Sequence, residues 1–277
     1  MIDKEHAELS VRQQCELLGV SRSGLYYRRR EEREENRQLK ELLVREHLNA
    51  PIYGGRKLVK VACRASYKVG RKRVTRLMRE LNIKALMPRR RQGLSQGDDQ
   101  ARKYPYLLRG MEITHANQVW TTDITYVRLG KGFVYVTALI DVYSRYIVGW
   151  SLSTSLETVF CVETFRRAMV RHGTPEIVNT DQGSQYTSGE YVKALEQAEV
   201  RLSMDGKGRV FDNILIERFW RTLKYEEVYL RRYESVRDAR ESIAEYMAFY
   251  NQRRLHQHLG YRTPAEVYEA QESEVAA

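Results

Sequence analysis

Apolar residues near the N-terminus recur at helical spacing, which predicts two short helices around a turn within residues 10–30. A glycine suits the turn and a serine can cap the second helix, which ends in the arginines of residues 28–30. The positions concerned are Val11, Cys15, Leu18, Gly19 and Ser21. This is the layout of a helix-turn-helix, whose second helix can enter a DNA groove. An ordinary helical hairpin with a charged end fits the same pattern.

A second helical unit is predicted upstream of residue 88. Residues 31–49 are polar and rich in charge, which favours a connecting helix, and Pro51 ends it. Residues 56–62 and 70–81 predict two further helices. The last of these has an apolar face of Val74, Leu77, Met78 and Leu81 and basic positions at Arg71, Lys72, Arg73, Arg76 and Arg79. Such a helix can simply be packed with a solvated face, but two basic units in succession favour DNA contact.

From residue 118 onward the pattern changes to β-branched and aromatic residues, which predicts strands. Residues 130–132 (GKG) suit a hairpin turn, and a bend near residues 143–145 leads to a third strand. Alternating helices and short strands follow, with helices at about 156–172, 188–199, 212–229 and 236–254 and strands at EIVNT and VRLSMD. This order predicts an α/β fold in which helices flank a mixed sheet.

The charge of the chain is strongly asymmetric. The net charge is +11 over 277 residues, and residues 1–100 hold 24 basic and 13 acidic residues, so the remainder is neutral. This asymmetry indicates a basic region that binds a polyanion, joined to a neutral globular domain. The 42% hydrophobic content excludes wholesale disorder. Export and membrane spans are not expected, and the three cysteines are predicted to be reduced thiols in a cytoplasmic protein.

Three acidic residues stand where structural reasons for them are weak. Asp123 interrupts a predicted strand, Asp181 follows another strand, and Glu217 lies among apolar helical residues and is expected to be partly buried. Each alone can be an edge-strand acid, a turn residue or a salt-bridge partner. Acids gathered at a sheet end repel one another unless cations hold them. Together they predict a site for Mg²⁺, or Mn²⁺, in which two ions could serve phosphoryl displacement.

Other polar residues compete for this assignment. Asp141 precedes a turn and is interpreted as structural, while Asp205 and Asp212 are interpreted as loop and cap residues. Lys224 lies seven residues after Glu217, about two helical turns, so both are expected on one helix face, although a solvated surface lysine fits too.

Three stretches of the chain match a known pattern. WTTDITYV, NTDQGSQYTS and SMDGKGRVFDNILIERFWRTLK resemble the integrase-type core of insertion-sequence transposases, above all the second-reading-frame protein of the IS-three family. Asp181 and Glu217 are separated by 35 residues, the spacing of that family's Asp–Asp–Glu triad. The tail YNQRRLHQHLGYRTPAEVY and the upstream stretches IYGGRKL and GRKRVTRLMREL are also similar to the family.

The resemblance implies an RNase H-like, retroviral-integrase-type sheet preceded by small helix-turn-helix-like domains. It implies that Asp123, Asp181 and Glu217 are both catalytic and metal-binding. Residues predicted to contact DNA are Lys224, Arg71, Lys72, Arg73, Arg76, Arg28, Arg29, Arg221 and Lys207. The bulky Phe219-Trp220-Arg221 replaces smaller residues that are usual after the glutamate, and we expect it to alter DNA contacts without touching the chemistry.

The domains expected on this basis follow the chain in order. They are a helix-turn-helix-like unit with a connecting helix (1–49), a second such unit (50–87), a linker (88–112), the catalytic core (113–230) and a helical extension (231–277). The implied function is a DNA transposase, a polynucleotidyl transferase that cleaves 3′ ends and transfers strands.

Two alternatives share these features: a non-catalytic DNA-binding regulator of the element, and a nuclease that hydrolyses without joining. Expected partners are double-stranded DNA (terminal inverted repeats and target DNA), further copies of the chain in a homodimer or higher oligomer, and an upstream-frame fusion segment. The expected location is the bacterial nucleoid in the cytoplasm.

Overall fold

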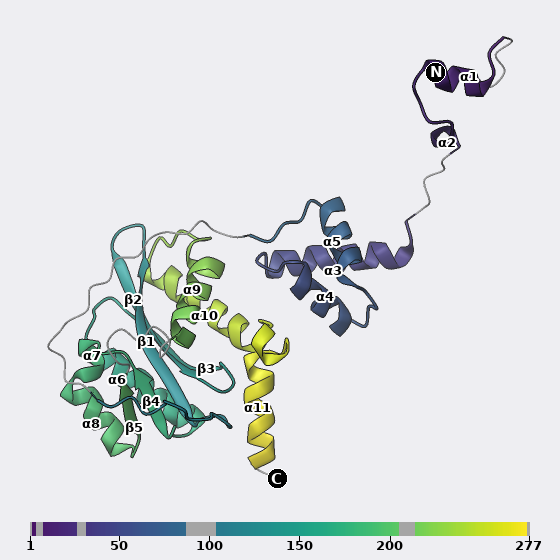
Figure 1. Ribbon diagram of the computed structural model, residues 1–277. Coiled ribbons are helices and arrows are strands. Elements are labelled where there is room, and N and C mark those ends of the chain that lie inside the picture. Colours follow the sequence, from purple (N-terminus) through teal and green to yellow (C-terminus); the bar gives the residue numbers. More distant parts are fainter. Residues whose placement is uncertain (1, 4–7, 27–31, 87–103, 205–213, 276–277) are drawn as a thin grey trace.

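The computed structural model describes residues 2–3, 8–26, 32–86, 104–204 and 214–275 (Figure 1). At the N-terminus, α1 (Val11–Leu17) and α2 (Arg22–Leu25) pack against each other across a turn at Gly19, as predicted. A capping box begins α1, in which the side chains of Ser10 and Gln13 bond to each other's backbone amides. Ser21 is the N-cap of α2 but forms no side-chain cap bond.

Three helices share one hydrophobic core upstream of the sheet. These are α3 (Glu34–Asn49), α4 (Gly55–Arg64) and α5 (Arg71–Glu80). Leu39, Leu43, Leu58, Val74 and Leu77 of these helices are almost completely buried together. The helix expected to be a connection, α3, is therefore part of this unit, because its leucines complete the apolar face of α5.

The sheet has five strands in the order β3-β2-β1-β4-β5. They are β1 (Val119–Arg128), β2 (Phe133–Asp141), β3 (Ile147–Ser153), β4 (Ile177–Thr180) and β5 (Arg201–Met204). The first three are antiparallel, and β4 and β5 run parallel to β1. Gly132 has a φ of 81°, which the predicted hairpin turn between β1 and β2 requires and which glycine adopts without strain.

Alternating side chains divide the sheet between two cores. Val136 and Ala138 of β2 face α9 (Ile214–Leu223) and α10 (Val236–Gln252) in one core. Leu139, the neighbour of Ala138, faces α6 (Thr158–His172) and α8 (Gly189–Gln197) in the other. The sheet is thus covered by helices on both faces (Figure 1), as its continuous apolar strands require.

The described C-terminal part is mainly helical. A π-helical turn (Lys224–Val228) continues α9, a short 3-10 helix spans Gln257–Leu259, and α11 spans Pro264–Val275. The last two lie within the predicted helical extension (231–277) but beyond the helix predicted at about 236–254. Among the described residues, no helix combines the length and apolar character needed to cross a membrane.

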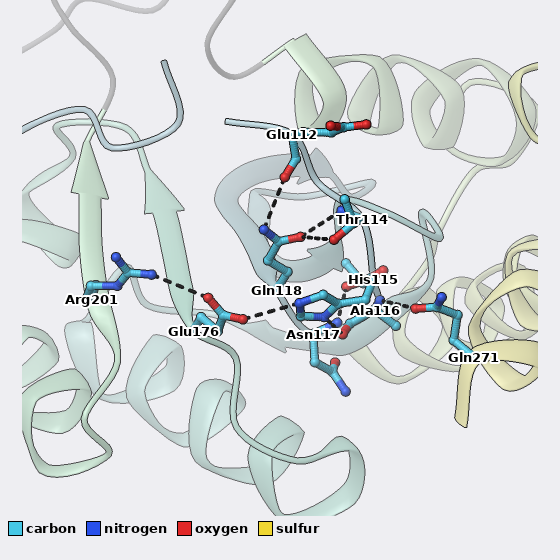
Figure 2. Close-up of polar contacts among 10 residues, drawn as sticks. Glu112, Thr114, His115, Ala116, Asn117, Gln118, Glu176, Arg201 and Gln271 are labelled. Atoms are coloured by element: carbon cyan, nitrogen blue, oxygen red, sulfur yellow. Dashed lines mark hydrogen bonds and ion pairs between the residues drawn. The ribbon is translucent and has the colours of Figure 1, made fainter. Parts of the chain in front are cut away.

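The parallel strands are fixed at their N-terminal ends by polar contacts (Figure 2). The imidazole Nε2 of His115 lies 3.3 Å from the carboxylate of Glu176, which also pairs with Arg201 of β5. The Gln271 side chain of α11 accepts a 3.0 Å hydrogen bond from the Ala116 amide. These contacts connect the segment before β1 to β4, β5 and the C-terminal helix, and so support the register that positions the carboxylates farther along the strands.

Candidate active site

The parallel pairing of β1 and β4 brings two of the predicted acids together. Thr121 of β1 is opposite Asn179 of β4, and Asp123 and Asp181 each come two residues later. Residues two apart on a strand point to the same face, and paired strands are about 4.8 Å apart. The two carboxylates therefore emerge side by side where β4 ends.

Both oxygens of the Asp123 carboxylate accept hydrogen bonds. Oδ1 accepts from the backbone N–H of Ile124 at 2.7 Å, and Oδ2 accepts from the indole Nε1–H of Trp220 at 2.9 Å. Burial raises the pKa of Asp123 to about 7, and the negative charges of Asp181 and Glu217 add to this rise. The two N–H donors lower this pKa, but burial and the neighbouring negative charges raise it by more.

Asp181 is fixed by the turn that follows β4. Its Oδ1 accepts a 2.9 Å hydrogen bond from the backbone N–H of Gly183, which lowers the pKa of the carboxyl, but burial raises that pKa by more. A Cβ on Gly183 would lie 2.9 Å from the same oxygen. Glycine is therefore needed here for space, since the carboxylate lies directly against the backbone.

Glu217 approaches the other two acids from α9. It lies three residues before Trp220, so both are on the face of α9 that contacts β1. The expected partial burial of Glu217 is wrong: the side chain is exposed, because its apolar neighbours in the sequence turn to other sides of the helix. Within the described part of the chain, no three carboxylate, imidazole or thiol groups converge closely enough to hold a metal ion.

Lys224 adds a positive charge beside the carboxylates. It lies in the π-helical turn, and its ammonium group is 5.0 Å from the centre of the Tyr126 ring of β1. Burial lowers the pKa of Lys224, while the negative charge of Asp123 favours its protonated form. The lysine is thus near the site, as the two-turn spacing from Glu217 predicted.

Two aromatic residues that were not assigned to the site from the sequence lie against it. The bulky Phe219-Trp220-Arg221 was expected to affect DNA contacts alone, but the structure also places the Trp220 indole in a hydrogen bond with Asp123. Tyr186, fully buried, hydrogen-bonds through its hydroxyl to Thr122 at 3.1 Å and Thr137 at 3.3 Å. It thereby joins the segment after Asp181 to β1 and β2. Tyr186 lies in the stretch NTDQGSQYTS, and Trp220 lies in the stretch that contains Glu217. Their proximity to the acids in these stretches was the feature of the sequence that could have identified them.

Some of the residues predicted to contact DNA are paired with an acid in the structure, and others are not. Arg73 bonds to Glu35 and Asn36, and Arg76 pairs with Glu80 at 3.4 Å. Arg71 and Lys72 are exposed and form no ion pair with an acid of the described ranges. The guanidinium of Arg221 lies 5.6 Å from the centre of the Tyr225 ring. Arg28, Arg29 and Lys207 lie outside the described residues.

Asp141 has a structural environment, as interpreted from the sequence. Its side chain is fully buried and accepts three hydrogen bonds, from the amides of Asn117 and Ser144 and from the Ser144 hydroxyl. A buried carboxylate with this many donors holds the turn between β2 and β3 and leaves little capacity for a ligand.

Comparison with known proteins identifies the domains of the chain. Two family models, each described as an integrase core domain, match residues 113–210 and 198–264, and a model described as an HTH-like domain matches residues 33–91. A cryo-electron microscopy structure of the simian T-cell lymphotropic virus intasome in complex with PP2A regulatory subunit B56 gamma has a similar fold. Its TM-score is 0.51 at 14% identity, covering 83% of this chain and 74% of that chain. The chain is thus an integrase-type protein with an RNase H-like core and a helix-turn-helix-like DNA-binding domain.

Curated relatives define the family. The chain is 34% identical over 224 residues to the transposase for insertion sequence element IS904 of Lactococcus lactis subsp. lactis (strain IL1403), covering 79% of this chain and 88% of that protein. It is 29% identical to the transposase InsF for insertion sequence IS3 of Escherichia coli O111:H-, covering 96% of each. The chain belongs to the IS3, or IS-three, family of insertion-sequence transposases. It is a DNA transposase and hence a polynucleotidyl transferase, as the resemblance implied.

Proposed function

We propose that Asp123, Asp181 and Glu217 form the catalytic centre with which this transposase cleaves the 3′ ends of its element and joins them to DNA. The observation that supports the proposal most directly is the parallel register of β1 and β4, which places Asp123 and Asp181 side by side, with Glu217 close enough for its charge to act on Asp123. Three acids from separate elements that repel one another have no evident structural use.

The donor chemistry fits a divalent metal cofactor. Carboxylate oxygens are the ligands that Mg²⁺ and Mn²⁺ prefer, and neighbouring negative charge favours cation binding. Asp123 and Asp181 would hold the metal together with Glu217, whose exposed side chain is the least constrained of the three. One or two such ions would activate the attacking oxygen and stabilise the charge that develops on the phosphate.

The protein's own groups orient this chemistry. Trp220 and the backbone of Ile124 hold the Asp123 carboxylate, and Gly183 holds that of Asp181. Lys224 would bind a phosphate next to the scissile bond. A water molecule displaces the 3′ oxygen at an element end, and the freed 3′-hydroxyl then attacks a second phosphodiester, first near the opposite end and later in target DNA. The hydrolytic step breaks the bond between phosphorus and the 3′ oxygen and leaves a 5′-phosphate on the flanking strand, and each later step exchanges one phosphodiester bond for another. No protein nucleophile is therefore needed.

The test uses a labelled duplex that ends in the terminal inverted repeat of the element, with Mg²⁺ present. We expect Asp123→Asn, Asp181→Asn and Glu217→Gln each to abolish both cleavage and joining while remaining folded by circular dichroism. Glu163→Gln, which changes an exposed acid on α6, is the matched control and should be fully active. Full activity of any triad variant would overturn the assignment. Cleavage without joined product would favour the nuclease alternative.

We also propose that the active form contains at least two copies of the chain, because two element ends must be held together during transfer. Sedimentation of the protein with and without repeat-ended DNA tests this, and a strictly monomeric complex would contradict it. An upstream-frame fusion segment is a further proposal, which a slippery frameshift site in the DNA before the Met1 codon would support.

A further inference from the structure

A hollow of about 600 Å³ lies between the helix-turn-helix-like unit and the C-terminal segment. Its basic lining residues are Arg56, Lys57, Arg71, Arg79 and Lys84, from α4, α5 and the segment after α5. Met78, Ile83 and Tyr261 contribute apolar surface. Among the described residues that line the hollow, none is acidic.

Several basic residues of the unit outside this hollow have an acidic partner. Arg73, Arg76 and Lys40 are each neutralised by an acid, with Lys40 contacting both Glu32 and Glu80. By contrast, Arg56, Arg71, Arg79 and Lys84 form no ion pair with any acid in the described ranges. Lys60, Lys68 and Lys72 of the unit also form no ion pair with an acid of the described ranges, but they do not line the hollow, where five basic residues gather without an acid.

Lys57 is the most enclosed of these cations. Its ammonium group lies 4.7 Å from the centre of the Tyr53 ring. Burial, together with the charge of Arg254, lowers the pKa of Lys57 to about 8. A cation in such a position would be stabilised by an anion in the hollow, because the anion would offset both the desolvation and the repulsion.

The helix ends add to the same electrostatic preference. Both α4 and α5 are ten residues long, begin at a glycine N-cap without a side-chain cap bond, and have no acid in the first turn. Basic residues occupy those first turns instead, where the helix dipole disfavours them. Free backbone N–H groups together with side-chain cations form a favourable environment for a phosphate.

The hollow exists only because two distant parts of the chain meet. The Tyr53 hydroxyl donates to the Arg253 carbonyl at 3.2 Å and accepts from the Leu255 amide at 3.1 Å. Arg64 of α4 donates to the Tyr261 carbonyl at 3.0 Å and pairs with Glu266. Gln257 and Tyr261 of the C-terminal segment then complete one wall of the hollow.

We propose that this hollow binds a backbone phosphate of the DNA held by the transposase, so that the helix-turn-helix-like unit and the C-terminal segment grip DNA together. The proposal rests on DNA binding by the chain and is independent of the catalytic assignment. Of the α5 residues predicted from the sequence to contact DNA, it keeps Arg71 and sets aside Arg73 and Arg76. It adds Arg79, together with Arg56, Lys57 and Lys84.

The test is fluorescence anisotropy of a labelled repeat-ended duplex with the full chain and no divalent metal, so that failure of the catalytic proposal cannot affect the result. Arg71→Ala and Arg79→Ala should each weaken binding by roughly threefold to tenfold and lower the salt dependence by about one unit of slope. Arg76→Ala removes one charge from the same helix, at a residue already paired with Glu80. It should bind DNA like the unsubstituted protein.

All three arginines are exposed, so the variants should fold normally, and thermal unfolding checks this. Equal losses for Arg76→Ala and Arg71→Ala, or no loss for Arg71→Ala and Arg79→Ala, would overturn the proposal. A second arm titrates the protein with AMP as a mononucleotide probe. AMP binding that Arg71→Ala abolishes, with duplex binding intact, would identify a small-molecule site instead and also overturn it.

Discussion

The indole N–H of Trp220 donates a 2.9 Å hydrogen bond to Oδ2 of Asp123, joining α9 to β1. Trp220 is 5% exposed and packs in the core between the sheet and α9 and α10. A side chain held this firmly fixes the direction of the carboxylate to which it bonds. In the proposed catalytic centre, Trp220 would therefore be a positioning residue that acts through Asp123.

Replacing Trp220 with phenylalanine keeps an aromatic ring in the core and removes the N–H donor. We expect the kcat of strand transfer to fall about tenfold to a hundredfold, with little change in the KM for DNA, because only the orientation of the carboxylate is lost. Single-turnover kinetics with repeat-ended DNA measure this. The control is Trp150→Phe, because the side chain of Trp150 packs against the same core. Equal activity of the two variants would contradict the positioning role.

Replacing Gly183 with alanine should displace the second aspartate. The new Cβ would lie 2.9 Å from Oδ1 of Asp181, so the carboxylate must turn away and lose its bond to the Gly183 amide. We expect at least a tenfold loss of cleavage with an almost unchanged unfolding temperature. Gly189→Ala places a Cβ in open space at the start of α8 and should retain activity. If both variants cleave equally well, Gly183 does not constrain Asp181.

The buried His256 predicts a loss of stability in acid. Burial, followed by the positive charges of Arg254, Lys57 and Arg145, lowers the pKa of His256 to about 2. Between that pH and about 6.5, where the unfolded histidine titrates, the unfolded chain binds one proton more than the folded chain. Stability therefore falls as pH decreases through this range, by about 2 kcal/mol from pH 6.5 to 5.0 for this group.

The His256→Gln variant tests this dependence, because glutamine can still accept the Arg254 hydrogen bond that reaches His256 Nε2 at 3.2 Å. Urea unfolding at pH 7.5 and 5.0 should show a smaller acid-induced loss in the variant. His258→Gln, at an exposed histidine, should keep most of the loss. An unchanged loss in His256→Gln would mean that His256 is not the group responsible.

The ion pair between Glu226 and Arg254 should contribute strongly to the stability of the folded protein. Two hydrogen bonds of 2.7 and 2.6 Å join the guanidinium to the carboxylate, and both side chains are nearly buried, at 13% and 12% exposure. Glu226→Gln would leave the arginine charge uncompensated, which typically costs about 3–5 kcal/mol. Thermal or urea unfolding measures this loss.

The matched control is Glu241→Gln, which breaks the pair with Arg237 on the surface of α10, where the side chains are 62% and 86% exposed. Exposed pairs contribute little, so a change below about 1 kcal/mol is expected. Similar losses in Glu226→Gln and Glu241→Gln would show that burial does not determine the value of the first pair.

The sequence by itself determined the order of most elements and the identity of the acids. Runs of β-branched and aromatic residues predicted the strands, and the sequence pattern predicted α4, α5, α6 and α8 closely, because such preferences are set by local backbone geometry. The spacing between Asp181 and Glu217 and the charge of the first 100 residues were likewise visible in the chain. Together with the resemblance of the quoted motifs to a known family, they were sufficient to predict a DNA transposase.

Only the tertiary structure decided which groups meet. The parallel register of β1 and β4 aligns Asp123 with Asp181, and α9 then brings Trp220 to the same carboxylate, 97 residues away in sequence. Partners also decide which cations are free to bind DNA: Arg73 is neutralised from α3, whereas Arg71 faces the hollow. Hydrogen bonding, burial and charge compensation depend on which residues are close in space. The local pattern of the sequence does not specify this for residues that are far apart along the chain.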